Sequence, residues 1–127
     1  DIVLCTALIE HLEKDEGEKL LREMEGIARK QVIISTPVGK YKQGALEGNP
    51  HQEHRYIWKP DALKDRGYKV RGVGIRGVMG EGALFSRLVN VIGGLRWIPW
   101  LLAGPFVYFV PKLAGTQVCW KRTNTLG

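Results

Sequence analysis

The sequence is poor in the residues on which several classes of small protein depend. It has only two cysteines among 127 residues, with no C-x-x-C pair and no clustered Cys/His spacing. A disulfide framework and a zinc ribbon are therefore not expected, and Cys5 and Cys119 should be reduced thiols in the core. The uncharged stretch 97–110 is too short to span a bilayer, and its prolines should break any single helix.

Acidic residues are missing from the carboxyl-terminal third. All 13 of them lie at or before Glu81, so the net charge of +6 is concentrated beyond it. Such an apolar and basic region suits an anionic membrane surface or a phosphate-bearing substrate, or else consists of solvated charge around a hydrophobic subdomain. The basic residues concerned are Arg87, Arg96, Lys112, Lys121 and Arg122.

The amino-terminal part predicts an α/β unit. The apolar run from Ile2 to Cys5 has no alternation, which indicates a parallel strand covered on both faces. Gln31 to Thr36 is a second β-branched run of the same kind, ended by Pro37. A strand, a helix and a strand within about 35 residues predict a right-handed crossover.

The helix between these strands has recognisable start signals. Asp15 and Glu18 suit its N-cap and N3 positions. Apolar residues then follow at helical spacing and should pack on the sheet. They are Leu20, Leu21, Met24, Ile27 and Ala28.

The middle of the chain predicts a loop, a short helix and a strand. Residues 38–50 have no periodicity and should form a long loop at the carboxyl end of the second strand. Pro60 suits the first position of a helix that Gly67 ends. Tyr68 to Ile75 should be a strand, and the G-x-G-x-x-G pattern at 72–77 is interpreted as strand and turn, because no acidic residue follows at the distance a dinucleotide site requires.

Two further segments complete the chain. Residues 83–114 should form an apolar insertion or cap, helix-spaced in its first part, with Trp97, Trp100 and Tyr108 as amphipathic anchors. Thr116 to Arg122 should be the final strand.

Histidines draw attention in two places. Glu10-His11 follows the first strand, at the edge of a parallel sheet where ligands bind. His51 and His54 form an H-x-x-H spacing, but Pro50 argues against a preformed helix spanning both. The lone H-x-x-H motif is therefore a weak indication of a metal site.

Two stretches of the sequence resemble a known family. Asp1-Ile-Val-Leu-Cys-x-x-Leu-Ile-Glu-His-Leu12, a charged helix and Val-Ile-Ile-Ser-Thr-Pro37 resemble the fourth strand, following helix and fifth strand of class I S-adenosylmethionine-dependent methyltransferases. Asn-Pro-x-Gln-Glu-His-x-x-x-Trp-x-Pro-x-x-Leu-x-x-x-Gly-Tyr68 resembles the region that follows. Because both stretches occur in the right order, the match is stronger than either motif alone.

The resemblance implies a fold and a domain organisation. The fold class would be α/β, half of a Rossmann-like methyltransferase sheet, with the final strand antiparallel between the fifth and sixth strands of the family. Residues 1–127 would be a single partial domain, with an α/β core at 1–82, the apolar insertion at 83–114 and the final strand at 115–122. The family's glycine-rich loop and ribose-binding acidic residue lie upstream of its fourth strand, and this chain has neither.

The resemblance also implies site residues and a cofactor. Backbone and side chains of Cys5, Thr6 and Ala7 would border the methionine end of S-adenosylmethionine. His54 would overlook the transferable methyl group, with His11 close by, and either histidine could serve as a base; a loop histidine that only orients backbone is the competing interpretation for His11. Some methyltransferases acting on quinone precursors hold a metal with Glu-x-x-Glu-His, but Ala7 replaces the first Glu, so no metal is carried over.

Two hypotheses about function follow. The first is methyl transfer to a small-molecule or lipid-like acceptor by a cytoplasmic enzyme that can be membrane-peripheral, of which this chain is the carboxyl-terminal part and is expected to be inactive alone. The second is a non-catalytic truncated module for membrane docking or for dimerisation through an exposed sheet edge. Neither includes nucleic acid as a partner, because acids precede bases along the first helix, as expected of a solvated face.

Overall fold

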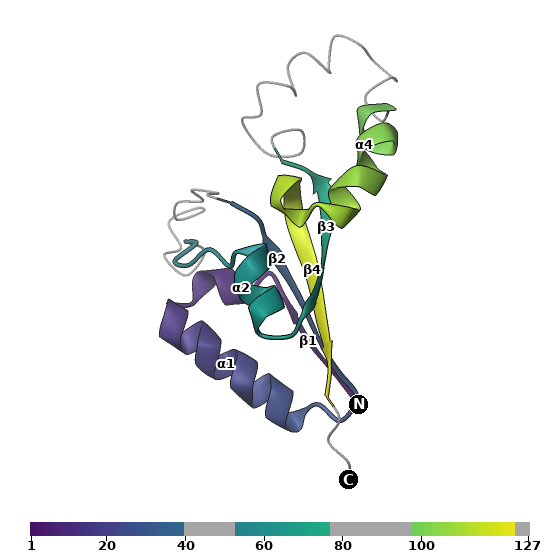
Figure 1. The fold of residues 1–127 in the computed structure, drawn as a ribbon. Coiled ribbons are helices and arrows are strands. Elements are labelled where there is room, and N and C mark those ends of the chain that lie inside the picture. The colour runs from purple at the N-terminus through teal and green to yellow at the C-terminus, as the bar shows by residue number, and fades with distance from the viewer. Residues whose placement is uncertain (40–52, 77–97, 124–127) are drawn as a thin grey trace.

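The computed structural model describes residues 1–39, 53–76 and 98–123. In these ranges the fold is mixed α/β, with one sheet of four strands (Figure 1). The strands are β1 (Ile2–Thr6), β2 (Gln31–Pro37), β3 (Lys69–Ile75) and β4 (Ala114–Arg122). The expected segments 83–97 and 40–50, together with His51, lie outside the described residues.

The order of the strands is β1-β2-β4-β3. β1 runs parallel to β2, with Leu4 opposite Ile33, whereas β4 is antiparallel to both β2 and β3. The last strand along the chain thus lies between the second and the third. This arrangement agrees with the expected antiparallel insertion of the final strand.

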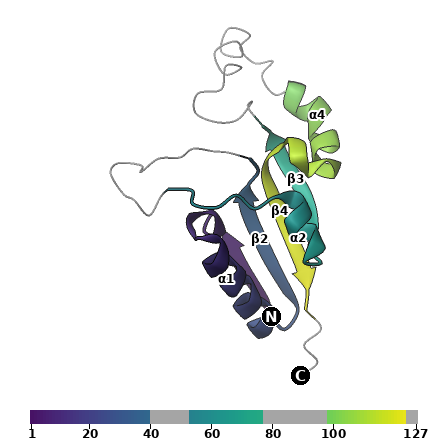
Figure 2. The same ribbon diagram turned by 60° about the vertical axis from the view of Figure 1, so that its left-hand side comes forward.

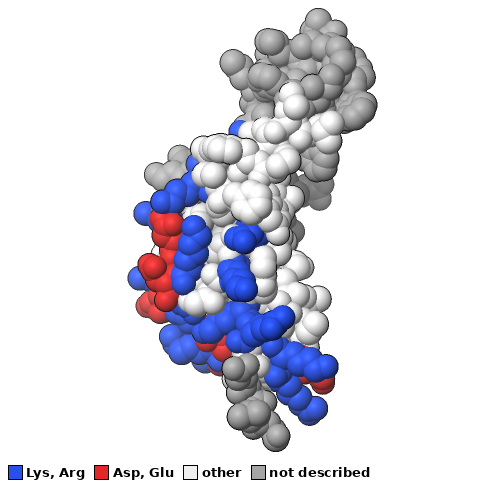
Figure 3. Space-filling view, turned by 45° about the vertical axis from the view of Figure 1, so that its right-hand side comes forward, with Lys and Arg blue, Asp and Glu red and all other residues white. Residues whose placement is uncertain are grey.

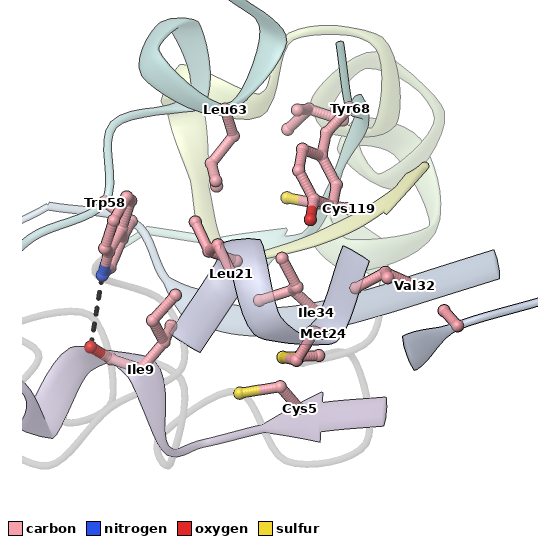
Figure 4. Close-up of a cluster of buried hydrophobic side chains, with 12 residues drawn as sticks. Cys5, Ile9, Leu21, Met24, Val32, Ile34, Trp58, Leu63, Tyr68 and Cys119 are labelled. Atoms are coloured by element: carbon pink, nitrogen blue, oxygen red, sulfur yellow. Dashed lines mark hydrogen bonds between the residues drawn. The ribbon is translucent and has the colours of Figure 1, made fainter. Parts of the chain in front are cut away.

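Helices cover one face of the sheet. Figure 2 shows α1 (Lys14–Ile27) and α2 (Pro60–Asp65) on the same side of the strands. Leu21 and Met24 from α1 and Leu63 from α2 meet the sheet residues Ile34 and Cys119 in a single core (Figure 4). Apolar burial on this side holds the layers together, because each fully buried side chain of this size contributes roughly 1.5–3 kcal/mol.

The expectation that the first strand is covered on both faces is wrong. β1 is an edge strand, and Ile2 and Leu4 are 53% and 65% exposed. β2 alternates instead, with Val32 and Ile34 buried and Ile33 half-buried on the opposite face. An apolar run therefore indicated a strand correctly but did not show how many layers cover it.

The first long helix starts earlier than expected. Its N-cap is Glu13, which forms a capping box with Glu16, rather than Asp15 with Glu18. Starting at Lys14 places Gly17 on the inner face, four residues before Leu21. Ile27 was expected on the apolar face that packs on the sheet, but it is 71% exposed.

The short helix α2 follows its sequence signals. Pro60 is its first residue, and Gly67 adopts φ +86° just beyond its end, where the amide of Tyr68 donates to the carbonyl of Leu63. Left-handed geometry of this kind at a helix end favours glycine.

The carboxyl-terminal helix is continuous, contrary to expectation. α4 (Ile98–Phe109) contains Pro105 and is followed by the 3-10 turn η4 (Pro111–Leu113). Pro105 is exposed, and so is Leu101, whose carbonyl has no amide to accept from one turn later. Water can therefore satisfy the freed carbonyl. No helix of the described ranges is long and apolar enough to cross a membrane.

Two glycines of the G-x-G-x-x-G pattern, Gly72 and Gly74, belong to the described part of the chain and lie within β3. A Cβ at Gly72 would collide with the carbonyl oxygen of Val107 in α4 and would approach the Cβ of Ala114 to 2.8 Å. The absence of a side chain at Gly72 is what allows α4 to lie on the sheet.

Candidate functional site

The candidate site lies at the carboxyl ends of β1 and β2. After β1 the chain passes through Ala7 into the single 3-10 turn η1 (Ile9–His11). Ala7 has φ +48°, a left-handed conformation that costs a non-glycine residue on the order of 1 kcal/mol or more. Its amide donates to the carbonyl of Ser35 at 3.0 Å, which fastens this turn to the end of β2.

Glu10 is the buried centre of the site. Only 3% of the residue is exposed, and its carboxylate accepts a hydrogen bond from the hydroxyl of Thr36 at 3.1 Å. Its backbone carbonyl accepts from the amides of Arg55 and Tyr56 at 2.9 and 3.2 Å. Glu10 therefore joins η1, β2 and the segment that carries His54.

His11 and His54 come together although 43 positions separate them. Their ring centroids are 5.0 Å apart, with the planes inclined by 60°. Nδ1 of His11 lies 3.1 Å from the carbonyl oxygen of Glu53. Because a carbonyl only accepts, this hydrogen bond requires the proton on Nδ1 and leaves the Nε2 lone pair of a neutral His11 free.

The three side chains form a convergent group. One potential ligand atom from each of Glu10, His11 and His54 lies within 4.8 Å of the others. Both imidazoles are half-buried, so the group has one covered carboxylate and two accessible nitrogen bases. Such a group can accept a proton, orient a hydroxyl or bind a cation.

Trp58 links the segment that carries His54 to η1, α1 and β4. Its indole Nε1 donates to the carbonyl of Ile9 at 3.2 Å, as Figure 4 shows. Its carbonyl accepts from the side-chain amide of Gln117 in β4, and its ring lies against Gly17, where a Cβ would come within 2.6 Å of Cζ2. A side chain at position 17 would push Trp58 away and shift the segment that begins at Glu53.

The three residues expected to border the cofactor differ in their exposure to solvent. Cys5 is buried and lies near Met24 in the core (Figure 4), and burial raises the pKa of its thiol. Only its backbone is left for a ligand. Thr6 and Ala7 are exposed at the carboxyl end of β1 and remain open to a bound molecule.

The two cysteines are both free and buried, as expected. Burial raises the pKa of Cys119 to about 12, so this thiol stays protonated near neutrality. Thiolate chemistry at Cys119 is therefore not part of the site.

No protein-family model, curated protein or solved structure matches this chain.

Sequence analysis did not assign roles to two residues of the site. Thr36 was identified only as part of a strand, and Glu10 only as a neighbour of His11. A hydroxyl at an inward position of an otherwise apolar strand was the available signal, because a buried polar group needs a partner. The partner itself, 26 positions away, could not be identified from spacing.

Proposed function

We propose that the chain forms the acceptor side of an S-adenosylmethionine-dependent methyltransferase, as the carboxyl-terminal part of its catalytic domain. The sequence resemblance described above supports the proposal, and so does the strand order β1-β2-β4-β3 with its antiparallel β4. The open edge of β1 is where further strands of a larger sheet would pair.

The observation that carries the proposal is the meeting of the two resembling stretches at one point. Glu10 and His11 belong to the first stretch, and His54 belongs to the second. Backbone hydrogen bonds from Arg55 and Tyr56 to Glu10 hold the stretches together. The site is therefore preassembled where α/β proteins bind their ligands.

Each residue has a distinct role in this proposal. Thr6 and Ala7 would border the methionine end of the cofactor, which supplies an electrophilic methyl group when bound. His54 and His11 would orient the acceptor and take its proton if it carries one, since neutral imidazole is a suitable base near pH 7. Positioning is the main requirement, because in-line methyl transfer depends on the approach angle of the acceptor.

Ligand titration by NMR tests this proposal. The ¹⁵N-labelled chain would be titrated with S-adenosylhomocysteine into the millimolar range, because most of the adenosine contacts of the resembled family come from strands outside this chain. We expect weak binding, with amide shifts concentrated at Thr6, Ala7 and Leu8. Adenosine alone, as the matched control, should not shift these amides.

Two results would count against methyl transfer. One is a complete lack of shifts at residues 6–8 up to the highest soluble ligand concentration. The other is an equal response to adenosine, which would show that the loop does not recognise the amino-acid end.

A second candidate function, docking of an apolar partner or membrane, has support from α4. Leu102 and Phe109 are 74% and 70% exposed, and Figure 3 shows mostly uncharged surface over this helix, with Lys and Arg gathered below. However, the nearby Lys112 forms an ion pair with Asp61 at 2.6 Å, which lowers the pKa of that carboxyl. The local charge is therefore less positive than the sequence suggests.

Vesicle co-sedimentation separates the two candidates. If α4 docks on lipid, Leu102→Ser with Phe109→Ser should abolish sedimentation with anionic vesicles and leave the S-adenosylhomocysteine shifts intact. Leu63→Ala is not a suitable control, because that residue is fully buried; Lys69→Ser, on the exposed part of β3, changes the surface without touching α4. No sedimentation of the unmodified chain would remove the docking function.

A further inference from the structure

We propose that Glu10, His11 and His54 form a binding site for a divalent transition-metal ion, with Zn²⁺ as the best-suited ion. The inference concerns the ligand geometry of the chain and can be measured without cofactor or acceptor. An imidazole that binds the ion through its basic nitrogen does not act as a base at the same time, so the site would serve one role or the other.

The donor set is the first argument. Two imidazole nitrogens and one carboxylate oxygen are the ligands found in many open zinc sites, where water or substrate takes the remaining position. Imidazole nitrogen also favours zinc over magnesium and calcium, which prefer all-oxygen surroundings. The three potential ligand atoms lie within 4.8 Å of one another.

Small movements would complete the coordination. With metal–ligand bonds of about 2.1 Å, tetrahedral ligands lie about 3.4 Å apart, so ligand atoms that are now within 4.8 Å of one another need to approach by at most about 1.4 Å. His54 lies between Glu53 and Lys59, in a stretch without helix or strand, where a change of side-chain rotamer does not disturb a helix or a strand.

The burial of Glu10 is the second argument. Glu10 is only 3% exposed as a residue, and an ionised carboxylate in such a buried residue needs compensation for its lost hydration. In the described part of the chain, no Lys or Arg forms an ion pair with it, and Thr36 gives it one neutral hydrogen bond. A cation between this carboxylate and the two imidazoles would supply the missing positive charge.

Outer contacts already orient two of the three ligands. The hydroxyl of Thr36 holds one carboxylate oxygen of Glu10 and leaves the other available. The carbonyl of Glu53 accepts from Nδ1 of His11, so the Nε2 lone pair can bind a metal. Hydrogen bonds of this kind usually accompany histidine and carboxylate ligands, and losing one weakens metal binding about 10–100-fold.

The experiment is a titration of the untagged, metal-stripped chain with Zn²⁺ by isothermal calorimetry. We expect one equivalent to bind. Glu10→Gln and His54→Ala should each weaken binding by about 100-fold or more, and Thr36→Val, which keeps the shape of the side chain, by about 10-fold. Glu23→Gln is the matched control, because that carboxylate is exposed on α1 and pairs only with Lys19 among the described residues.

A second measurement covers the case in which a variant fails to fold. In the unmodified chain, Zn²⁺ should shift the imidazole ¹⁵N resonances of both His11 and His54, with Nε2 of His11 as the bound nitrogen. The proposal is overturned if no zinc binds, if Glu10→Gln and His54→Ala bind as tightly as Glu23→Gln, or if neither imidazole responds. The last two results would indicate an adventitious ion only.

Discussion

Replacing Gly72 by alanine tests whether the glycine-rich segment of β3 is structural. The structure leaves no room for the new methyl group, which would overlap the carbonyl oxygen of Val107 and lie 2.8 Å from Cβ of Ala114 and 3.1 Å from Cα of Pro111. Two of these three atoms belong to the backbone, so no rotamer change can relieve the contact. α4 and η4 must move away from the sheet instead.

The expected cost follows from known effects of overpacking. One extra methyl group in a tightly packed position lowers the free energy of unfolding by about 1–3 kcal/mol. Gly26→Ala in α1 is the matched control, since a Cβ there meets nothing within 4 Å. Alanine within a helix should raise the free energy of unfolding by about 0.5–1 kcal/mol. A glycine-to-alanine substitution is thus expected to lower the free energy of unfolding at position 72 and to raise it at position 26.

Urea denaturation followed by circular dichroism measures both changes. Hydrogen exchange then locates the damage, which in Gly72→Ala should appear as faster exchange of α4 amides while α1 stays protected. Equal stability of Gly72→Ala and the unmodified chain would refute the argument that close contact with α4 requires glycine. If the unmodified chain bound a dinucleotide and Gly72→Ala abolished that binding without a loss of stability, a cofactor loop would be favoured instead.

Three further predictions concern the core. Trp58→Phe should lower the free energy of unfolding by about 1–3 kcal/mol in urea denaturation, because the carbonyl of Ile9 loses its buried donor; an unchanged midpoint would contradict this. Folding raises the pKa of Cys119 from 9.0 to about 12, so the free energy of unfolding should fall as pH rises from 9 towards 12, and less so in Cys119→Val; equal slopes in the two proteins would be the contrary result. Leu21→Ala should cost about 2–5 kcal/mol and Ile27→Ala under about 0.5 kcal/mol, and similar costs would show that Ile27 is buried after all.

Local signals predicted the elements of the fold well. Pro60 and Gly67 marked the ends of α2, because a fixed φ and a left-handed glycine act within a few residues. The start of α1 was misplaced, since Glu13 with Glu16 and Asp15 with Glu18 are both credible capping pairs and only packing chooses between them. The effect of Pro105 was misjudged for a similar reason. The free-energy cost of a proline within a helix depends on whether water reaches the carbonyl that has lost its amide donor, here that of Leu101.

Long-range features were harder to predict. Exposure of Ile2 and Leu4 depends on which layers are present, and an apolar run contains no such information. The pairing of His11 with His54 could be expected only from the resemblance, and the buried contact between Glu10 and Thr36 was not expected at all. These contacts join residues far apart along the chain, and helix or strand periodicity gives no information about such distant pairs.

The position of β4 has a consequence for how the chain folds during synthesis. β2 and β3 are not neighbours in the sheet; each pairs with β4, so the sheet cannot close until residue 122 has been made. Until then, β1 and β2 can pair with each other, but β3 lacks the strand that it pairs with in the described sheet. Slow, non-local pairing of this kind leaves a nascent chain open to aggregation, and chaperones that shield β-strand segments would be needed most just before translation reaches β4.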